Sequence, residues 1–92
     1  MYTIKRSGKF KKEFKKIQRA GNFDTKTFLF IIDTLQEGKQ LPEKYKNHKL
    51  QGKFNRCLEC HIKSDLLLIY EPYKDTHELH LLRIGSHSEL FG

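Results

Sequence analysis

The chain is organised around its last fourteen residues, Leu79-His80-Leu81-Leu82-Arg83-Ile84-Gly85-Ser86-His87-Ser88-Glu89-Leu90-Phe91-Gly92. This stretch begins with β-favouring apolar residues and breaks at Gly85-Ser86, which predicts a final strand over residues 78–84 followed by a turn. Arg83 and His87 lie on either side of the break. Strand ends and the loops after them often hold reactive side chains on a rigid scaffold. A surface arginine and a mobile terminal histidine would give the same pattern, so both interpretations stay open at this point.

Two more strands are predicted before this one. Residues 66–70 form a nearly continuous apolar run, which is typical of a central strand covered on both faces. Alternation over residues 56–62 predicts a strand with two distinct faces. One face carries Leu58, Cys60 and Ile62, and the other carries Cys57, Glu59 and His61. Polar turns at residues 63–65 and 71–76 link the three strands into an antiparallel meander.

The N-terminal half predicts a short strand and two helices. Residues 2–6 favour a strand, and Phe10, Phe14 and Ile17 have the i, i+4, i+7 spacing of one helix face. A second apolar stripe at Phe28, Ile31, Ile32 and Leu35 predicts a helix that ends near Glu37. Residues 39–52 are expected to form a structured connection. The predicted fold class is α+β, with two N-terminal helices packed on a small, mainly antiparallel four-stranded sheet in the order β-α-α-β-β-β. Residues 1–92 are expected to form a single domain.

The charge balance favours a polyanionic partner. The chain has 18 Lys and Arg against 11 Asp and Glu, a formal charge of +7. Such an excess suits nucleic acid, an acidic protein or a membrane surface, although a basic surface kept for solubility is the alternative. No apolar run approaches the roughly 20 residues that a membrane-spanning helix needs. The charged N-terminus lacks the apolar region of a signal peptide, so we expect a cytoplasmic protein that does not contact membranes.

The cysteines suggest a cofactor that the strand pattern argues against. Residues 57–61 spell C-x-x-C-H, the attachment motif of c-type haem. A strand turns Cys57 and Cys60 to opposite faces, where one haem edge cannot reach both. Zinc would need four ligands such as Cys57, Cys60, His61 and His48, which is possible only if the strand prediction fails. We therefore expect Cys60 to be a core residue, Cys57 to be incidental, and the protein to hold no metal or cofactor.

Hairpin geometry brings several polar side chains to one rim of the predicted sheet. The first strand of the meander ends where the second begins, and the third strand finishes at the same edge. His61, Asp65, Arg83 and His87 can therefore converge there, with His48 in the connection that precedes the meander.

This set of groups suits metal-free cleavage of RNA. A base takes the proton of the ribose 2′-OH, an acid protonates the leaving 5′-oxygen, and a cation stabilises the charge that builds on phosphorus. Histidine, with an ordinary pKa of about 6.5, can serve as either acid or base. DNA lacks the 2′-OH, so the mechanism selects RNA. Phe91 could stack on a base or simply fold the C-terminal tail back onto the core.

Four segments of the chain resemble a known family. They are residues 48–52 (HKLQG), 60–65 (CHIKSD), 68–70 (LIY) and 83–92 (RIGSHSELFG). Together with the order of elements, they are similar to the YafQ branch of the RelE/ParE superfamily, bacterial toxins of type II toxin–antitoxin systems. The resemblance implies a ribosome-dependent endoribonuclease that cuts mRNA and a cognate antitoxin that neutralises it. It also implies contact with ribosomal RNA. The lysine-rich first helix fits that contact, or contact with the acidic segments of an antitoxin.

The resemblance also assigns site residues and leaves other functions open. The family's active-site motif falls on His48, His61, Asp65, Arg83, His87 and Phe91. By resemblance, His87 is the general acid and Arg83 the phosphate clamp, while base and positioning roles are shared among His48, His61 and Asp65. The family often has a tryptophan after the aspartate, where this chain has Leu66, so a base contact is lost. A ParE-like poison of DNA gyrase and a small basic RNA-binding module are the alternative functions.

Overall fold

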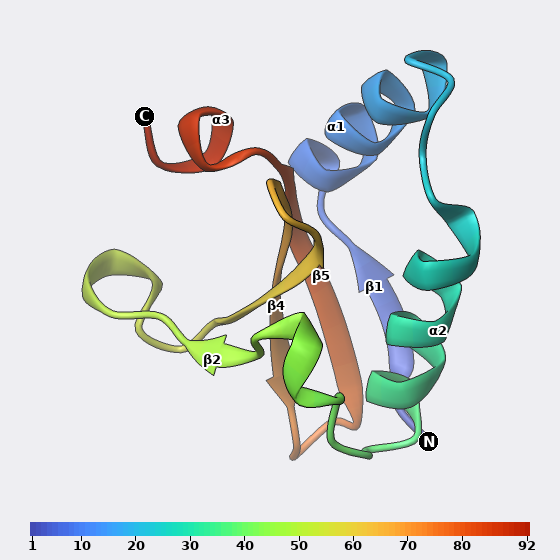
Figure 1. Ribbon diagram of the computed structural model, residues 1–92. Coiled ribbons are helices and arrows are strands. Elements are labelled where there is room, and N and C mark those ends of the chain that lie inside the picture. Colours follow the sequence, from blue (N-terminus) through green and yellow to red (C-terminus); the bar gives the residue numbers. More distant parts are fainter.

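The computed structural model describes residues 1–92, which form ten helical or extended segments (Figure 1). In chain order these are β1 (Thr3–Arg6), α1 (Gly8–Arg19), α2 (Thr25–Gln36), the 3₁₀ turn η1 (Glu43–Tyr45), β2 (His48–Lys49), the 3₁₀ turn η2 (Gly52–Phe54), β3 (Leu58–Lys63), β4 (Leu66–Tyr73), β5 (Glu78–Gly85) and α3 (His87–Phe91). The α+β class, both N-terminal helices and the meander of β3, β4 and β5 confirm the sequence prediction.

The sheet has five strands rather than the four predicted, in the order β1-β5-β4-β3-β2. The additional strand is β2, which pairs antiparallel with β3 through His48 and Lys49. A two-residue strand is too short for period-two alternation to register in the sequence. β1 lies at the other edge and runs parallel to β5, and all other pairs are antiparallel. The sheet is therefore mainly antiparallel, as predicted, with one parallel edge.

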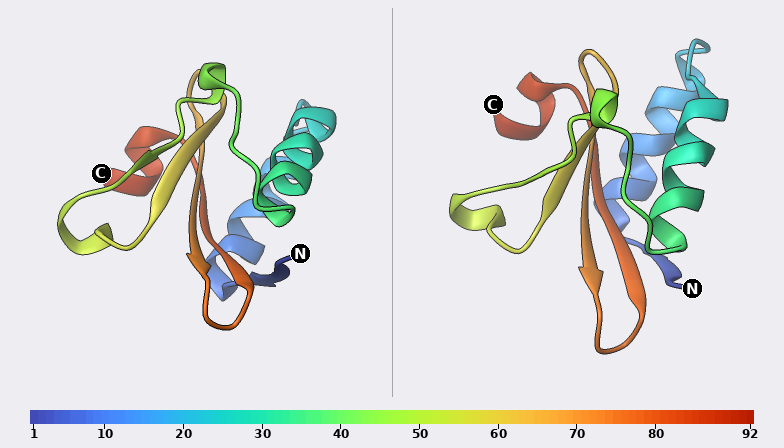
Figure 2. Two further views of the ribbon diagram at one scale, coloured as in Figure 1. Left: turned by 90° about the horizontal axis from the view of Figure 1, so that it is seen from below. Right: turned by 60° about the horizontal axis from the view of Figure 1, so that its bottom comes forward.

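Helices α1 and α2 cover one face of the sheet (Figure 2). α1 begins at its N-cap Ser7, whose hydroxyl oxygen accepts the Phe10 N–H at 3.0 Å and donates to the Leu82 carbonyl at 2.7 Å, which ties the helix start to β5. The predicted apolar stripes face the sheet, and Phe10 and Ile31 are almost fully buried. They pack in a 13-residue cluster that also contains Cys60, Ile62 and Ile84 from the sheet.

The opposite face of the sheet carries a second, smaller core that the sequence did not reveal. Cys57, Leu67, Ile69 and Leu90 are buried together there, and Leu50, Phe54 and Leu82 pack against them. Residues 50–57 and the C-terminal helix α3 lie on this side of the sheet, away from α1 and α2 (Figure 2). Cys57 is therefore a core residue, and its interpretation as incidental was wrong. Cys60 lies in the helix-side core, where burial raises the pKa of its thiol to about 12. No helix in the structure has the length and apolar character needed to cross a membrane.

A β-bulge in β5 decides where Arg83 points. Strict alternation would place Leu79, Leu81 and Arg83 on the same face, toward the helices. The pairing with β4 shifts instead, so that Tyr70 opposes Leu81 while Ile69 opposes Arg83. After this shift Ile84 packs in the helix-side core, and Arg83 lies outside that core. Bulges next to functional sites commonly redirect a side chain in this way.

Candidate active site

His87 and Asp65 meet where the β3–β4 turn approaches the start of α3. The Asp65 carboxylate accepts the backbone N–H of His87 at 3.1 Å and lies 3.3 Å from Nδ1 of the same residue. These hydrogen bonds stabilise the ionised carboxylate, so the pKa of Asp65 is lowered from its ordinary value. One carboxylate therefore fixes both the backbone and the ring of His87. With Nδ1 directed at Asp65, Nε2 is the ring nitrogen left for proton transfer.

A capping box holds α3 in place against this turn. The Ser86 hydroxyl accepts the Glu89 N–H at 3.2 Å, and the Glu89 carboxylate accepts the Ser86 N–H at 2.9 Å. Leu90 inserts into the second core. A Cβ at position 85 would stand only 3.0 Å from the Glu89 carboxylate and 3.3 Å from Leu90, so glycine allows the close approach. These contacts determine where His87 and Phe91 lie.

His48 and His61 lie around a buried glutamate, Glu59. Its side chain is only 4% exposed, and its Oε1 lies 3.6 Å from Nε2 of His48 and 3.4 Å from Nε2 of His61. The other nitrogen of His48, Nδ1, lies 2.7 Å from the Lys46 carbonyl. A carbonyl can only accept, so Nδ1 of His48 carries a proton. Glu59 was not among the predicted site residues, although the alternation had already placed it on the same strand face as His61.

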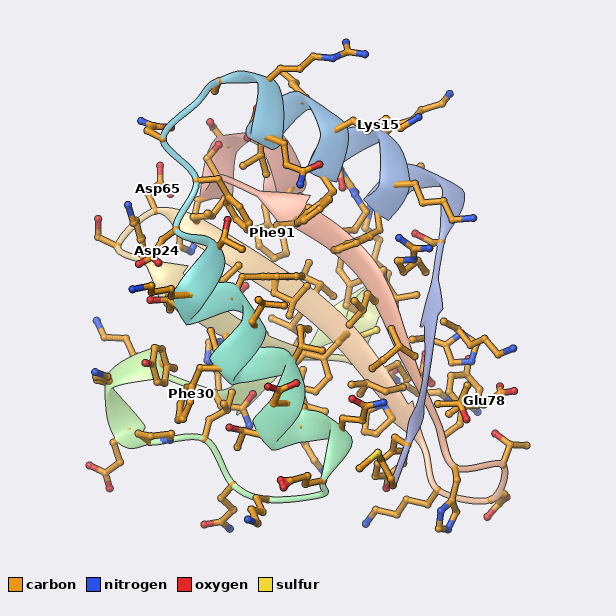
Figure 3. All side chains as sticks on the ribbon, turned by 90° about the vertical axis from the view of Figure 1, so that its right-hand side faces the viewer. Lys15, Asp24, Phe30, Asp65, Glu78 and Phe91 are labelled. Carbon is orange, nitrogen blue, oxygen red and sulfur yellow. The ribbon has the colours of Figure 1, made fainter.

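The aromatic rings form a continuous row across the site. Successive ring centroids are separated by 6.5 Å from His48 to His61, 5.9 Å from His61 to His87, 6.1 Å from His87 to Phe91, and 6.0 Å from Phe91 to Phe54. Figure 3 places Asp65 and Phe91 toward the end of the sheet opposite Glu78. His48, His61, Asp65, His87 and Phe91 therefore share one edge of the sheet. The hairpin geometry predicted this position for His61, Asp65 and His87.

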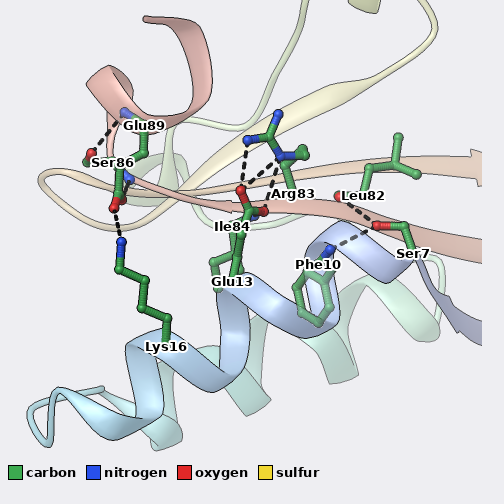
Figure 4. Close-up of polar contacts among 9 residues, drawn as sticks. All are labelled: Ser7, Phe10, Glu13, Lys16, Leu82, Arg83, Ile84, Ser86 and Glu89. Atoms are coloured by element: carbon green, nitrogen blue, oxygen red, sulfur yellow. Dashed lines mark hydrogen bonds and ion pairs between the residues drawn. The ribbon is translucent and has the colours of Figure 1, made fainter.

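Arg83 stands apart from the histidines, which differs from the expected convergence at the rim. Its Nε donates to both Glu13 carboxylate oxygens at 3.1 and 3.0 Å, and its Nη2 donates to one of them at 2.7 Å (Figure 4). These hydrogen bonds raise the pKa of Arg83. Arg83 opposes Ile69, which opposes Glu59, so two strand spacings separate the Cα atoms of Arg83 and Glu59, roughly 10 Å.

The site combines proton-transfer groups with one fixed cation. Imidazoles can donate or accept a proton near neutral pH. The guanidinium of Arg83 uses its Nε edge on Glu13, which leaves the outer fork of N–H groups available for an anion. The side chains of residues 1–92 form no group of three or more His, Cys, Asp or Glu that could hold a metal ion.

Comparisons with solved structures define the class of protein. A toxin from Helicobacter pylori, in a metal-bound crystal structure, is 44% identical with a TM-score of 0.92, covering 99% of this chain and 100% of the other. YafQ in the Escherichia coli DinJ–YafQ complex is 30% identical with a TM-score of 0.87, and both chains are covered completely. These likenesses in sequence and fold place this protein among small bacterial toxins.

The family follows from the sequence comparisons. Residues 2–92 match the family described as YafQ, bacterial toxin of type II toxin–antitoxin system. The mRNA interferase toxin YafQ of Escherichia coli K12 is 32% identical over 89 residues, which covers 97% of this chain and 95% of the relative. The chain belongs to the YafQ family of type II toxins, as the resemblance had implied.

Proposed function

We propose that this toxin is an mRNA interferase, an endoribonuclease that cuts mRNA on the ribosome and so inhibits translation. The names of its curated relatives, mRNA interferase toxin YafQ, support the reaction class. The histidine row supports it on chemical grounds, because two proton-transfer groups, His61 and His87, lie close to one another. The toxin acts in the cytoplasm as a single domain spanning residues 1–92.

The proposed reaction is attack by the ribose 2′-OH on the adjacent phosphorus. A base removes the 2′-OH proton as the new P–O bond forms, and the P–O bond to the 5′-oxygen breaks as that oxygen takes a proton from an acid. The products are a 2′,3′-cyclic phosphate and a 5′-OH. The scissile phosphate gains negative charge in the transition state, which a guanidinium stabilises. The bonds formed and broken and the two proton transfers balance without a redox or metal-bound species.

The observation that carries the proposal is the pair of imidazoles with separate carboxylates behind them. The His61 and His87 rings are 5.9 Å apart, with Glu59 at 3.4 Å from His61 and Asp65 at 3.3 Å from His87. His87 is the general acid, and Asp65 orients it. His61 is the base, since Glu59 stabilises the cation that forms when His61 takes the 2′-OH proton.

The other site residues bind and orient the substrate. Arg83 holds the phosphate through its outer fork of N–H groups. The Nε2 atom of His48 lies 3.6 Å from the Glu59 carboxylate, so His48 helps to hold Glu59 in position. Phe91 stacks on a base beside the cut, which fits its 45% exposure at the end of the histidine row.

The proposed partners are an antitoxin and ribosomal RNA. YafQ of Escherichia coli was crystallised with DinJ as a toxin–antitoxin complex. We expect a cognate antitoxin to neutralise this chain by binding it in the same way. Lysines dominate the outer face of α1, and Figure 3 shows Lys15 directed away from the sheet. Such a face suits the phosphate backbone of ribosomal RNA.

Primer extension on an mRNA translated by purified ribosomes tests the function. We expect new cuts when the toxin and ribosomes are both present, and none when either is left out. His87→Ala serves as the matched protein control and should give no cuts. Cleavage of mRNA at the same rate without ribosomes would contradict the proposed dependence on the ribosome. No cuts, combined with gyrase-dependent DNA breaks, would favour the ParE-like alternative, and RNA binding without cleavage would favour a basic RNA-binding module.

A further inference from the structure

A hollow beside Arg83 lies outside the histidine row. It has a volume of about 470 Å³ and opens between the first turn of α1, the η2 segment and the middle of β5. The lining side chains that matter are Lys9, Lys53, Phe54, Leu82 and Arg83. Phe54 connects it to the site, because its ring lies 6.0 Å from that of Phe91, which in turn lies 6.1 Å from His87.

The hollow is positively charged, and no acidic side chain in its lining neutralises that charge. Lys9 and Lys53 form no ion pair, and no carboxylate lines the cavity. The Arg83 guanidinium is paired with Glu13, but Glu13 lines a different hollow, on the α3 side of the guanidinium. Glu13 is also the only acidic residue of α1. It therefore holds the Nε edge of Arg83 (Figure 4), and Arg83 also lines the cavity.

The hollow also has an apolar side. Phe54 is half-buried and meets Phe91 edge-on, at an interplanar angle of 90°. Leu82, the residue displaced by the β5 bulge, lies beside it and packs against the second core. Lys53 Nζ sits 5.4 Å from the Phe54 ring centroid. An aromatic ring flanked by ammonium and guanidinium groups suits single-stranded nucleic acid, because the ring can stack on a base and the cations can bind its phosphate.

We propose that this hollow is a nucleotide-binding subsite for the residue of the RNA strand adjacent to the scissile phosphate. Phe54 and Leu82 receive the base, while Lys9 and Lys53 bind the phosphate beyond it. Arg83 lines the hollow and also holds the scissile phosphate in the proposed reaction, so it bridges the scissile phosphate and its neighbour. The inference rests on the proposed nuclease function and extends it to the path of the substrate.

Binding of an uncleavable RNA tests the subsite apart from catalysis. A fluorescein-labelled RNA oligonucleotide with 2′-O-methyl groups at every ribose has no nucleophile, and fluorescence anisotropy reports its affinity. Lys53→Glu is compared with Lys74→Glu, an equal charge change at an exposed site in the β4–β5 turn. We expect Lys53→Glu to weaken binding about tenfold more than the control. Its slope of log affinity against log salt should also be shallower by about 0.7, the value for one lost phosphate contact on a single strand.

The aromatic half of the subsite is tested with abasic RNA. One abasic position is moved along the oligonucleotide, and the position with the largest penalty is measured again with Phe54→Leu. We expect a penalty of about fivefold or more in the wild type, the lower end of base–aromatic stacking, and almost none in the variant. Thermal melting of each variant checks that the fold is retained.

The outcomes separate the subsite from the nuclease assignment. Equal binding by Lys53→Glu and Lys74→Glu, or an abasic penalty unchanged in Phe54→Leu, would overturn the subsite even if mRNA is cut normally. The expected binding differences in a toxin that cuts no mRNA would retain the nucleotide site and remove the nuclease function.

Discussion

At the scale of single residues, the site depends on carboxylates that face imidazoles. Asp65 accepts two hydrogen bonds from His87, one from the backbone and one from the ring. Glu59 faces two imidazoles from a buried position. Burying a carboxylate is costly unless charged or hydrogen-bonding groups surround it, so the position of Glu59 between His48 and His61 indicates that the imidazoles and the carboxylate form one unit.

The Asp65–His87 contact should make stability depend on pH. The folded-state pKa of Asp65 is lowered, so its contribution is present above the unfolded pKa of about 3.9 and is lost as pH falls through the folded value. We expect Asp65→Asn to be less stable than the wild type at neutral pH. The two should converge in urea-unfolding experiments once the pH has fallen through the folded-state pKa of Asp65. A difference in the free energy of unfolding that persists unchanged at acid pH would contradict a stabilising contact between Asp65 and His87.

His87→Ala should separate chemistry from folding. The side chain is 57% exposed, so its removal costs little packing. We expect kcat to fall by at least about 100-fold, the lower end of what a general acid contributes, while the melting temperature changes little. The assay is ribosome-dependent cleavage, alongside circular dichroism. Full toxicity of a folded His87→Ala protein would remove the general-acid role.

Residue types and hairpin geometry were enough to predict that His61, Asp65 and His87 lie together at this edge. These residues flank turns that the polar and glycine residues of the sequence predict. Glu59 and Glu13 were missed for different reasons. The burial of Glu59 depends on the second core, which the hydrophobic periodicity of the sequence does not predict. Glu13 is 70 residues from Arg83 along the chain, and no local pattern links such a pair.

At the scale of elements, a five-residue helix and a bulge position the functional groups. α3 is too short to be stable alone and depends on its capping box and on the buried Leu90. The bulge in β5 sends Ile84 into the core and Arg83 away from it. The sequence revealed the strand and the break after it, but not the helix, because residues 87–91 span little more than one turn and leave no measurable apolar period.

Removing the cap of α3 should affect activity more than stability. Ser86→Ala takes away the hydroxyl that accepts the Glu89 N–H, at a cost of about 1 kcal/mol. Because His87 follows directly, we expect kcat to fall several-fold while the melting temperature drops by only a few degrees. Ser88→Ala, whose hydroxyl does not cap a backbone N–H, is the control. Equal kcat values for the two variants would contradict a positioning role for the cap.

Glu13 joins α1 to β5. It accepts the Ile84 N–H at 3.1 Å as well as the Arg83 guanidinium, and both partners are largely shielded. Glu13→Ala should therefore destabilise the fold by about 1–3 kcal/mol, since these donors lose their acceptor. Urea unfolding measures the loss. Glu37→Ala, which removes an exposed pair with Lys39 at 3.6 Å, should cost under about 1 kcal/mol. Equal losses would show that Glu13 makes only a surface contact.

At the scale of the whole molecule, the helices that pack on the sheet and the residues of the site lie in different parts of the structure. α1 and α2 close one face of the sheet, and α1 presents lysines to solvent, while α3 lies over the other face. The histidine row lies at one edge of the sheet, and the hollow beside Arg83 opens between the first turn of α1, η2 and β5. The layer order and the helical stripes could be predicted, because they follow from periodicity. The short strand β2 and the second core could not, since they depend on contacts between distant segments. The site therefore lies where the structure depends most on contacts that the sequence could not predict.

The ends of the cut RNA test the central claim most directly. If imidazoles transfer protons around an attacking 2′-OH, the upstream fragment must end in a 2′,3′-cyclic phosphate, or the 3′-phosphate formed by its hydrolysis, and the downstream fragment must begin with a 5′-OH. Mass spectrometry of fragments from ribosome-bound mRNA identifies both ends. We expect the cyclic phosphate with a 5′-OH. A 3′-OH paired with a 5′-phosphate would contradict the account, because attack by water rather than by the 2′-OH would then have cut the chain.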